Sequence, residues 1–323
     1  MIRKWLAGAA LAALFVSAAN AASVATDPMA EKVLAQMSSA FMNRAWSGTM
    51  MYSQGENSVS LQFHQDVVGG KTVERIERLS GDPIQVMRRG NWLLGLYPGA
   101  ESMRQGHALP AGTLRPLNQR IEHIKTHYTL QLGQPTRVAG RDAQPVWLRA
   151  NDQYRYTRKY WCDIETGLML RSQTLDSSGR VLEQFEFVSV ELGQPIEQDT
   201  VVVDAQGMQV FRHAVVNTPL VDMAPLNELP PGFIPMGQGS ADQPIQTHLF
   251  TDGISMVSVF YEAVAGPSPD VLAQQGPTRA FSRVLNWEGE HYKVTVVGEV
   301  PEVLLRNMVQ TVNPAALAGL IRG

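Results

Sequence analysis

Histidine and cysteine are the side chains here that most often support catalysis or metal binding, and their spacing matches no known site. His123 and His127 stand four residues apart, as two ligands on one helix face would. The sequence H-I-K-T-H lacks the glutamate of the zinc-protease motif H-E-x-x-H, and no third ligand follows at a suitable spacing. We therefore predict no metal site and interpret the pair as surface histidines.

Cys162 is the single cysteine, so the chain cannot form an internal disulfide. A reactive or intermolecular thiol is one interpretation, but the adjacent carboxylate of Asp163 opposes thiolate formation, so a small apolar side chain in a strand is favoured. The sequence also contains no G-x-S-x-G nucleophile elbow and no glycine-rich loop for phosphates. We predict a protein without catalytic residues and without a cofactor.

Aromatic and basic residues alternate over residues 154–160, Y-R-Y-T-R-K-Y. On a strand, Arg155 and Lys159 share one side, whereas Arg158 and the tyrosines share the other. The side with Arg155 and Lys159 can hold a phosphate or carboxylate, and a solvated strand face is the alternative interpretation.

Charge and the first residues restrict the class of protein. The chain has 27 Lys and Arg against 30 Asp and Glu, a net charge of −3, which argues against nucleic acid as a partner. Arg3 and Lys4 precede a short apolar run that ends in Ala19-Asn20-Ala21, so residues 1–21 are predicted to be a secretory signal peptide. No later stretch is apolar enough to span a membrane.

The elements that would position these residues are mostly strands. Asp27 and Pro28 mark the start of a helix over 28–43, and a shorter helix is expected around Ile121. Leu61 and Phe63 alternate with polar residues, which is typical of strands. Turn residues separate the expected strands at 48–53, 58–65, 71–79, 84–88, 92–97, 128–132, 146–150, 155–161, 168–175 and 181–190. Residues 22–205 are therefore predicted to form one large antiparallel sheet with two helices, and residues 98–116 a loop.

Two modest helices are few to cover so large a sheet. A partly open barrel with an apolar cavity for acyl chains is one interpretation, and a filled core is the other. If a cavity exists, its candidate lining residues are Tyr52, Leu61, Phe63, Ile76, Trp92 and Leu94.

Composition changes after residue 205. Residues 206–240 are rich in proline and glycine and are predicted to be a linker and irregular segment. Residues 241–323 are predicted to form a small α+β domain with hairpins at 246–262 and 280–297 and a final helix after Pro301.

An ordered set of motifs resembles the RseB/MucB family, the periplasmic negative regulators of the sigma-E (AlgU-type) envelope stress response. In the first domain the matching segments are R-V-A-G-R (137–141), N-D-Q-Y-R-Y (151–156), D-I-E-T-G-L-M-L (163–170) and V-L-E-Q-F (181–185). In the second domain they are P-P-G-F (230–233) and T-D-G-I-S-M-V-S-V-F (251–260). The match covers nearly the whole chain after residue 21, in the right order.

The resemblance implies an α+β fold: an N-terminal half-open antiparallel β-barrel with helices, similar to the lipoprotein carriers LolA and LolB, and a smaller α+β C-terminal domain. It implies a periplasmic protein that binds the periplasmic region of a transmembrane, RseA/MucA-like anti-sigma factor, shields it from site-1 proteolysis and releases it on sensing lipid or lipopolysaccharide. Arg155 and Lys159 would then meet an anionic lipid. Candidate partner-binding residues are Phe233, Phe250, Met256, Val259 and Phe260.

A periplasmic lipid or lipoprotein carrier without a signalling partner is the alternative function. It predicts that the first domain alone suffices for activity, whereas the regulator needs both domains. The sequence leaves open whether the free protein is a homodimer.

Overall fold

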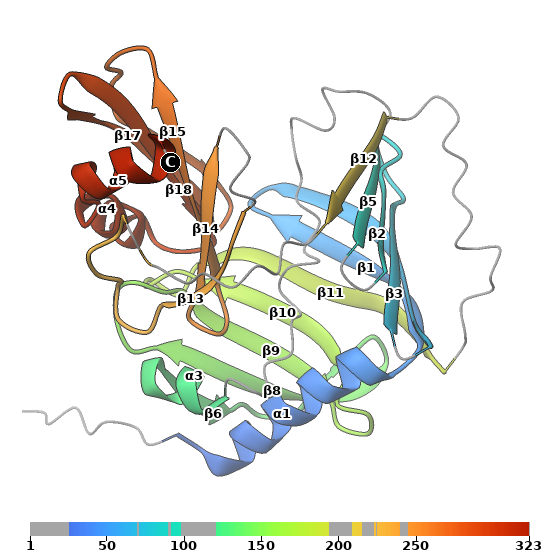
Figure 1. Cartoon of the computed structure of the whole chain (residues 1–323). Helices are drawn as coiled ribbons and strands as arrows, with labels where there is room; N and C mark the ends of the chain where they lie inside the picture. Colours follow the sequence, from blue (N-terminus) through green and yellow to red (C-terminus); the bar gives the residue numbers. More distant parts are fainter. Residues whose placement is uncertain are drawn as a thin grey trace, which may run out of the picture.

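The computed structural model contains two antiparallel sheets, one in each half of the chain (Figure 1). The structure describes residues 26–69, 71–89, 92–97, 121–193, 209–214, 223, 225–239 and 245–322. The predicted signal peptide and the loop predicted at 98–116 lie outside these ranges. Within the described ranges, no helix combines the length and hydropathy that a bilayer crossing requires.

The first helix, α1 (Pro28–Asn43), begins and ends where the sequence predicts. The carboxylate of Asp27 accepts a hydrogen bond from the backbone N–H of Met29 at 2.8 Å, and Pro28 takes the first helical position, where no N–H is needed. Ala30, Leu34 and Met37 form the buried face of the helix and pack with residues of the first sheet.

Short turns join most strands of the first sheet, so its order largely follows the chain. The order is β12-β5-β4-β3-β2-β1-β11-β10-β9-β8-β6, with β7 paired to β8. The strands are β1 (Trp46–Gln54), β2 (Asn57–Val68), β3 (Lys71–Arg78), β4 (Gln85–Arg89), β5 (Trp92–Tyr97), β6 (Tyr128–Leu132), β7 (Thr136–Val138), β8 (Arg141–Ala150), β9 (Thr157–Asp163), β10 (Met169–Leu175), β11 (Val181–Leu192) and β12 (Gln209–Ala214). The short helix α3 (Ile121–His127) leads into β6.

The first sheet is strongly curved, and α1 lies across one open end of the curve (Figure 1). Large aromatic side chains fill the concave face. The rings of Trp46 and Phe63 are stacked with 4.6 Å between their centroids, and those of Tyr52 and Phe185 are stacked at the same distance. Burial of one such side chain stabilises the fold by about 1.5–3 kcal/mol. Because several of them are buried together here, this face contributes a large part of the first domain's core.

The second domain is a smaller sheet with helices on one face. Its order is β13-β14-β15-β18-β17-β16, and α4 (Glu302–Gln310) and α5 (Pro314–Arg322) pack against β15, β17 and β18. The strands are β13 (Ile234–Gln238), β14 (Gln246–Thr251), β15 (Met256–Val264), β16 (Val271–Gln275), β17 (Thr278–Trp287) and β18 (Glu290–Gly298). Val259, Tyr261, Val294 and Leu304 are fully buried between this sheet and the helices.

The α+β fold class is confirmed, but five elements were not predicted from the sequence: β7, β12, β13, β16 and α5. β12 and β13 both lie in the range predicted as linker: β12 pairs with β5 of the first sheet, and β13 pairs with β14 of the second. β13 was not predicted because Pro235 and Gly237 are residues that usually interrupt strands. β13 is an edge strand, and it accommodates them at a shift in its pairing register with β14. β16 is fully exposed, so its residues show no alternation.

Candidate ligand cavity and domain interface

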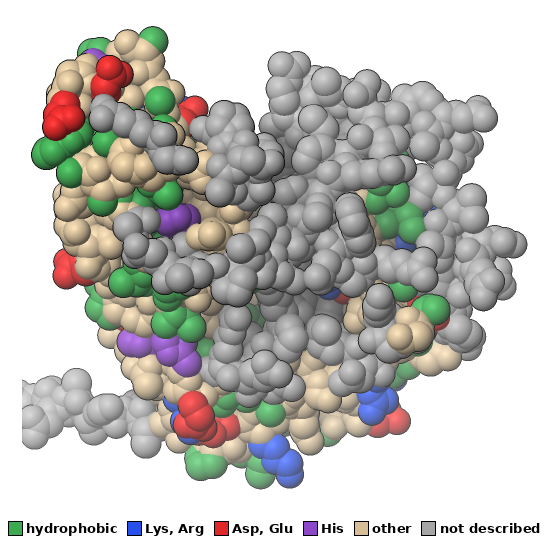
Figure 2. Space-filling model, in the orientation of Figure 1, with side chains coloured by type: hydrophobic (Ala, Val, Ile, Leu, Met, Phe, Trp, Pro, Cys, Tyr) green, Lys and Arg blue, Asp and Glu red, His purple; other side chains and the backbone are tan. Residues whose placement is uncertain are grey.

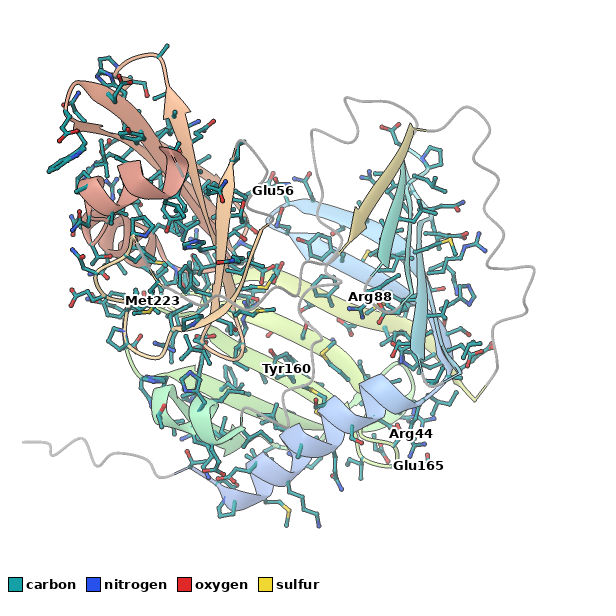
Figure 3. All side chains as sticks on the ribbon, viewed as in Figure 1. Arg44, Glu56, Arg88, Tyr160, Glu165 and Met223 are labelled. Carbon is teal, nitrogen blue, oxygen red and sulfur yellow. The ribbon has the colours of Figure 1, made fainter. Side chains whose placement is uncertain are left out.

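A small cavity lies on the concave face of the first sheet. Its apolar lining is Met50, Leu61, Phe63, Ile76, Met169 and Phe185, and Tyr160 projects from the same face (Figure 3). The enclosed space is about 20 Å³. One water molecule needs about 10–15 Å³ on this measure. In this conformation the cavity therefore has room for a water-sized ligand, and an acyl chain can enter only if lining side chains move.

The polar end of the cavity is formed by Arg158, Thr174 and Glu183, which are cross-strand neighbours on β9, β10 and β11. The Arg158 Nη1 donates to the Thr174 hydroxyl and, at 3.4 Å, to Glu183 Oε1. Thr174 donates to the same Glu183 oxygen at 2.9 Å, and the Tyr52 hydroxyl donates to the other at 3.3 Å. Glu183 is thus held on the concave face by three strands.

Arg158 also reaches the second domain. Its Nη2 donates to Glu299 Oε2 at 3.0 Å and to the Ser255 hydroxyl at 3.4 Å. Arg158 is 3% exposed, so these contacts are made away from water. Arg158 is therefore part of the cavity wall and of the contact between the domains.

The Arg158 cluster contains two carboxylates for one guanidinium. Burial is the main cause that raises the pKa of Glu183, and repulsion from Glu299 raises it further. Burial and the charge of Glu183 also raise the pKa of Tyr52, which keeps its hydroxyl protonated and able to donate. The cluster consequently favours the binding of a proton over that of an additional anion.

Arg155 forms a second buried contact between the domains. Its Nη1 donates to Asp252 Oδ2 at 3.0 Å, and its Nε donates to Asp152 Oδ1 at 2.9 Å. The Tyr128 hydroxyl donates to the same Asp252 oxygen at 2.8 Å, and Arg155 also donates to the carbonyl oxygen of Pro231. The side chains of Arg155 and Asp252 are both 0% exposed. We call Arg155 and Arg158 the interdomain arginines.

Further contacts surround the interdomain arginines. The ring of His123 on α3 forms a 2.6 Å hydrogen bond with the carbonyl of Gly232, and the His127 ring packs against the same glycine. Figure 2 shows histidine side chains gathered over α3, at the junction of the domains. Arg279 Nε, from β17, donates to the Tyr156 hydroxyl at 2.9 Å. The two histidines thus lie at the domain contact.

Some of the predicted lipid-binding residues meet at the cavity and others do not. Leu61, Phe63 and Ile76 line it, and Tyr52 binds the cavity residue Glu183. The half-buried Leu94 pairs with Met87 of β4. The neighbouring residue of β4, Val86, pairs with the cavity residue Ile76, so alternation points Met87 and Leu94 to the opposite, outer face of the sheet. The side chain of Trp92 lies outside the described residues.

The structure does not bring Arg155 or Lys159 to the cavity, although the family resemblance implies an anionic lipid as their partner. Arg155 precedes β9, and its charge is engaged in the domain interface. The Lys159 ammonium lies over the rings of Trp147 and Trp161, 4.3 and 4.2 Å from their centroids. Alternation along β9 points it away from Arg158 and Tyr160.

The predicted partner-binding residues are divided by the second sheet. Phe250 and Val259 are 0% exposed and belong to the domain core, and Phe233 is buried beneath the Arg155 guanidinium. Met256 and Phe260 are half-buried and alternate with the core residues of β15, so they lie on the face away from α4 and α5. A partner can contact the last two without unfolding the domain.

Four residues of the site were not predicted from the sequence: Arg158, Glu183, Asp252 and Glu299. Alternation groups Arg158 with Tyr160 on one side of the strand, but it gives no signal for which side faces the cavity. The three acidic residues, Glu183, Asp252 and Glu299, show no sequence pattern that links them to the site. They lie far apart in the chain and reach the site through contacts with the two arginines.

Other chemistry of the described residues is limited. Cys162 lies buried in β9, and burial, with a smaller contribution from Asp163, raises the pKa of its thiol to about 12. Its thiolate is therefore scarce at neutral pH. Within the described ranges, no three His, Cys, Asp or Glu side chains are grouped to hold a metal ion.

Comparison with known proteins places both domains in one family. A family model described as the MucB/RseB N-terminal domain matches residues 29–205, and one described as the MucB/RseB C-terminal domain matches residues 225–313. The sigma factor AlgU regulatory protein MucB of Pseudomonas aeruginosa is 28% identical over 293 residues, 88% of this chain and 91% of the relative. The sigma-E factor regulatory protein RseB of Salmonella typhimurium is 24% identical, over 97% of this chain and 98% of the relative.

Solved structures agree with this placement. A chain in the complex of Pseudomonas aeruginosa MucA and MucB is similar with a TM-score of 0.70 and 26% identity, over 88% of this chain and 98% of that chain. A crystal structure of MucB with the periplasmic part of MucA gives a TM-score of 0.68. Family models thus cover more than half of the chain in the expected order, and the protein belongs to the MucB/RseB family.

Proposed function

We propose that this protein is a non-catalytic periplasmic regulator of a sigma-E-type stress response. It binds the periplasmic region of a transmembrane anti-sigma factor and shields that region from the first proteolytic cut. The observation that carries the proposal is the match of both domains, in order, to a family whose member MucB has been solved in complex with MucA. The alternative, a lipid carrier, gives no role to the second domain.

We further propose that a lipid entering the cavity is the signal for release. Arg158 supports this, because it is shared between the cavity wall and the contact with Glu299. An acyl chain must first displace lining side chains, and the unbranched Met50 and Met169 are the ones best able to move. Each methylene that becomes buried then contributes about 0.8 kcal/mol, which offsets that rearrangement.

An anionic lipid head group that reached Arg158 would compete with Glu299. Exchange of one carboxylate or phosphate for another keeps the charge of the buried cluster nearly unchanged, and Glu299, which is 32% exposed, is the partner nearer to solvent. Loss of the Glu299 contact would weaken the domain interface. This links occupancy of the first domain to the position of the second.

Titration of the full-length mature protein with the purified periplasmic segment of the anti-sigma factor from the same genome tests the proposal. We expect binding at micromolar or tighter affinity, slower cleavage of the segment by the site-1 protease, and restored cleavage when lipopolysaccharide is added. Cleavage at the full rate in the presence of saturating protein would refute the regulator. Transfer of lipid between vesicles without any binding of the segment would support the carrier instead.

A further inference from the structure

The outer edge of the second sheet is an unprotected strand. β16 is last in the sheet order, and all five of its residues are exposed, including Val271 at 55% and Leu272 at 42%. Natural edge strands are commonly blunted by Lys, Pro or a bulge, because unpaired backbone groups invite another strand. The sequence V-L-A-Q-Q contains no charge and no proline, and its pairing with β17 is regular.

The register shows which backbone groups of β16 face outward. A two-residue loop, Gly276–Pro277, joins β16 to β17, so the flanking pair Gln275 and Thr278 is the hydrogen-bonded type. Alternation along the ladder then directs the N–H and C=O groups of Val271, Ala273 and Gln275 toward β17 and those of Leu272 and Gln274 outward. In the part of the chain that the structure describes, no strand pairs with this outward side.

One end of β16 meets the first domain. Gln54, at the end of β1, donates from Nε2 to the carbonyl of Gln275 at 3.5 Å, and its side chain packs against Gly276. Gln54 also donates to the Tyr52 hydroxyl at 2.9 Å, and Tyr52 in turn donates to Glu183 at the cavity. One end of a segment bound along β16 would therefore lie beside Gln54, which is linked through Tyr52 to Glu183 at the cavity.

A groove continues from the same end of the strand. Arg279 of β17 donates to the Gln274 side chain and lines a groove of about 740 Å³ between the domains. The groove wall also includes Trp147 and Arg149 of the first domain and Val303 of the second. An extended chain longer than β16 has a path from the edge into this groove.

We propose that β16 is the docking edge for an extended segment of the anti-sigma partner, which adds to the second sheet as a seventh strand. Backbone hydrogen bonds to Leu272 and Gln274 hold the segment, and its apolar side chains lie beside Val271 and Leu272. This inference rests on the proposed function and names the surface that carries it out.

A second copy of this chain is a poorer occupant of the edge. Pairing of two β16 strands gives a contact only about 17 Å long. Stable interfaces bury roughly 1,200–2,000 Å², which an isolated five-residue strand pair does not approach. A partner segment that runs from the edge into the groove contacts both domains and gains the missing area.

The test compares Leu272→Pro with Leu272→Val in the full-length mature protein. Proline removes the outward N–H of residue 272 but leaves the hydrogen bonds between β16 and β17 intact. Valine keeps both that N–H and an apolar side chain. We expect calorimetric titration with the periplasmic segment to show at least tenfold weaker binding for Leu272→Pro and a change below threefold for Leu272→Val. Equal binding by both variants would overturn the proposal.

Hydrogen exchange on the unmodified protein gives an independent readout that does not depend on a variant folding. On addition of the segment, the amides of Leu272 and Gln274 should gain protection of tenfold or more. Segment binding without that gain would overturn the docking edge and leave the proposed function standing. A complete lack of segment binding would reject both. Protection that rises with protein concentration alone would show self-association at β16 and overturn the choice of occupant.

Discussion

At the scale of single residues, the interdomain arginines determine how the domains are held together. Each guanidinium is buried and paired with carboxylates from both domains: Arg155 with Asp152 and Asp252, and Arg158 with Glu183 and Glu299. Removal of one partner from a buried ion pair leaves an uncompensated charge away from water, which costs far more than loss of an exposed pair.

Arg158→Met is expected to lower the free energy of unfolding by about 3–5 kcal/mol, because the buried carboxylate of Glu183 and the half-buried carboxylate of Glu299 lose their counter-charge. Arg180→Met is the matched control: Arg180 pairs with Asp176 at the surface and is 69% exposed, so we expect a change below about 0.5 kcal/mol. Urea unfolding of the two variants measures both values. Similar losses in the two would mean that Arg158 is not a buried ionic partner.

Glu183→Gln should change how stability depends on pH. Burial raises the pKa of Glu183 above its ordinary value of 4.5, so the folded protein keeps this proton at a pH where the unfolded chain has released it. Glu183 therefore contributes stability below pH 4.5 that is lost as pH rises through its folded pKa. We expect the stability of Glu183→Gln relative to wild type to increase between pH 4 and pH 7. A constant difference across this range, measured by urea unfolding, would contradict the assignment.

At the scale of elements, the contact between α3 and the segment 230–233 depends on a close approach that only glycine allows. Gly232 has φ +80°, and a Cβ there would lie 2.4 Å from the His127 ring. The P-P-G-F segment thus fits against α3, with Phe233 buried beneath Arg155. Residues 230–233, which lie in the segment predicted as a linker, therefore form part of a defined contact between the domains.

Comparison of Gly232→Ala with Gly179→Ala distinguishes the cost of backbone strain from the cost of steric crowding by His127. Both glycines adopt the left-handed backbone conformation, with φ +80° at Gly232 and +83° at Gly179. A Cβ added at Gly179 would have no neighbouring atom within 4 Å. We expect Gly179→Ala to cost about 1–2 kcal/mol from backbone conformation alone. Gly232→Ala should cost roughly 1–3 kcal/mol more because of the crowded His127 ring. Chemical denaturation of both variants gives the comparison, and equal losses would show that the contact is not tight.

At the scale of the whole molecule, the two sheets are joined through buried polar contacts instead of one continuous apolar core. The apolar core of the second domain contains no strand residue of the first, although Tyr154 packs against it. Such an interface is weakened when one charge is lost, which fits the proposal that occupancy of the first domain changes the position of the second.

Asp252→Asn tests whether the domains unfold as one unit. The asparagine can still accept the Ile254 and Ser255 amide bonds that shape its own turn, but it withdraws the carboxylate charge that Arg155 and Tyr128 contact. We expect scanning calorimetry to show one transition for the wild type and two for the variant. Asp270→Asn, which removes an exposed pair within the second domain, should keep a single transition. One transition for both variants would refute the coupling.

The sequence by itself determined α1, most strands of both sheets and the absence of recognised catalytic motifs, because capping residues, turns and alternation are local signals. Side-chain alternation also placed Leu61, Phe63 and Ile76 among the candidate lining residues, and in the structure all three line the cavity. Spacing could not place Lys159 relative to the cavity, because the two faces of β9 both carry basic residues and local spacing does not show which face is concave.

Only the tertiary structure decided how the charges are used. Asp252 and Glu299 come from the second domain, 97 and 141 residues after their arginine partners, and no local pattern links such positions. The pairing of β12 with β5 and the exposed edge at β16 likewise depend on how distant segments meet. Contact between distant segments is a property of the packed chain, since it requires burial that neighbouring residues in the sequence do not specify.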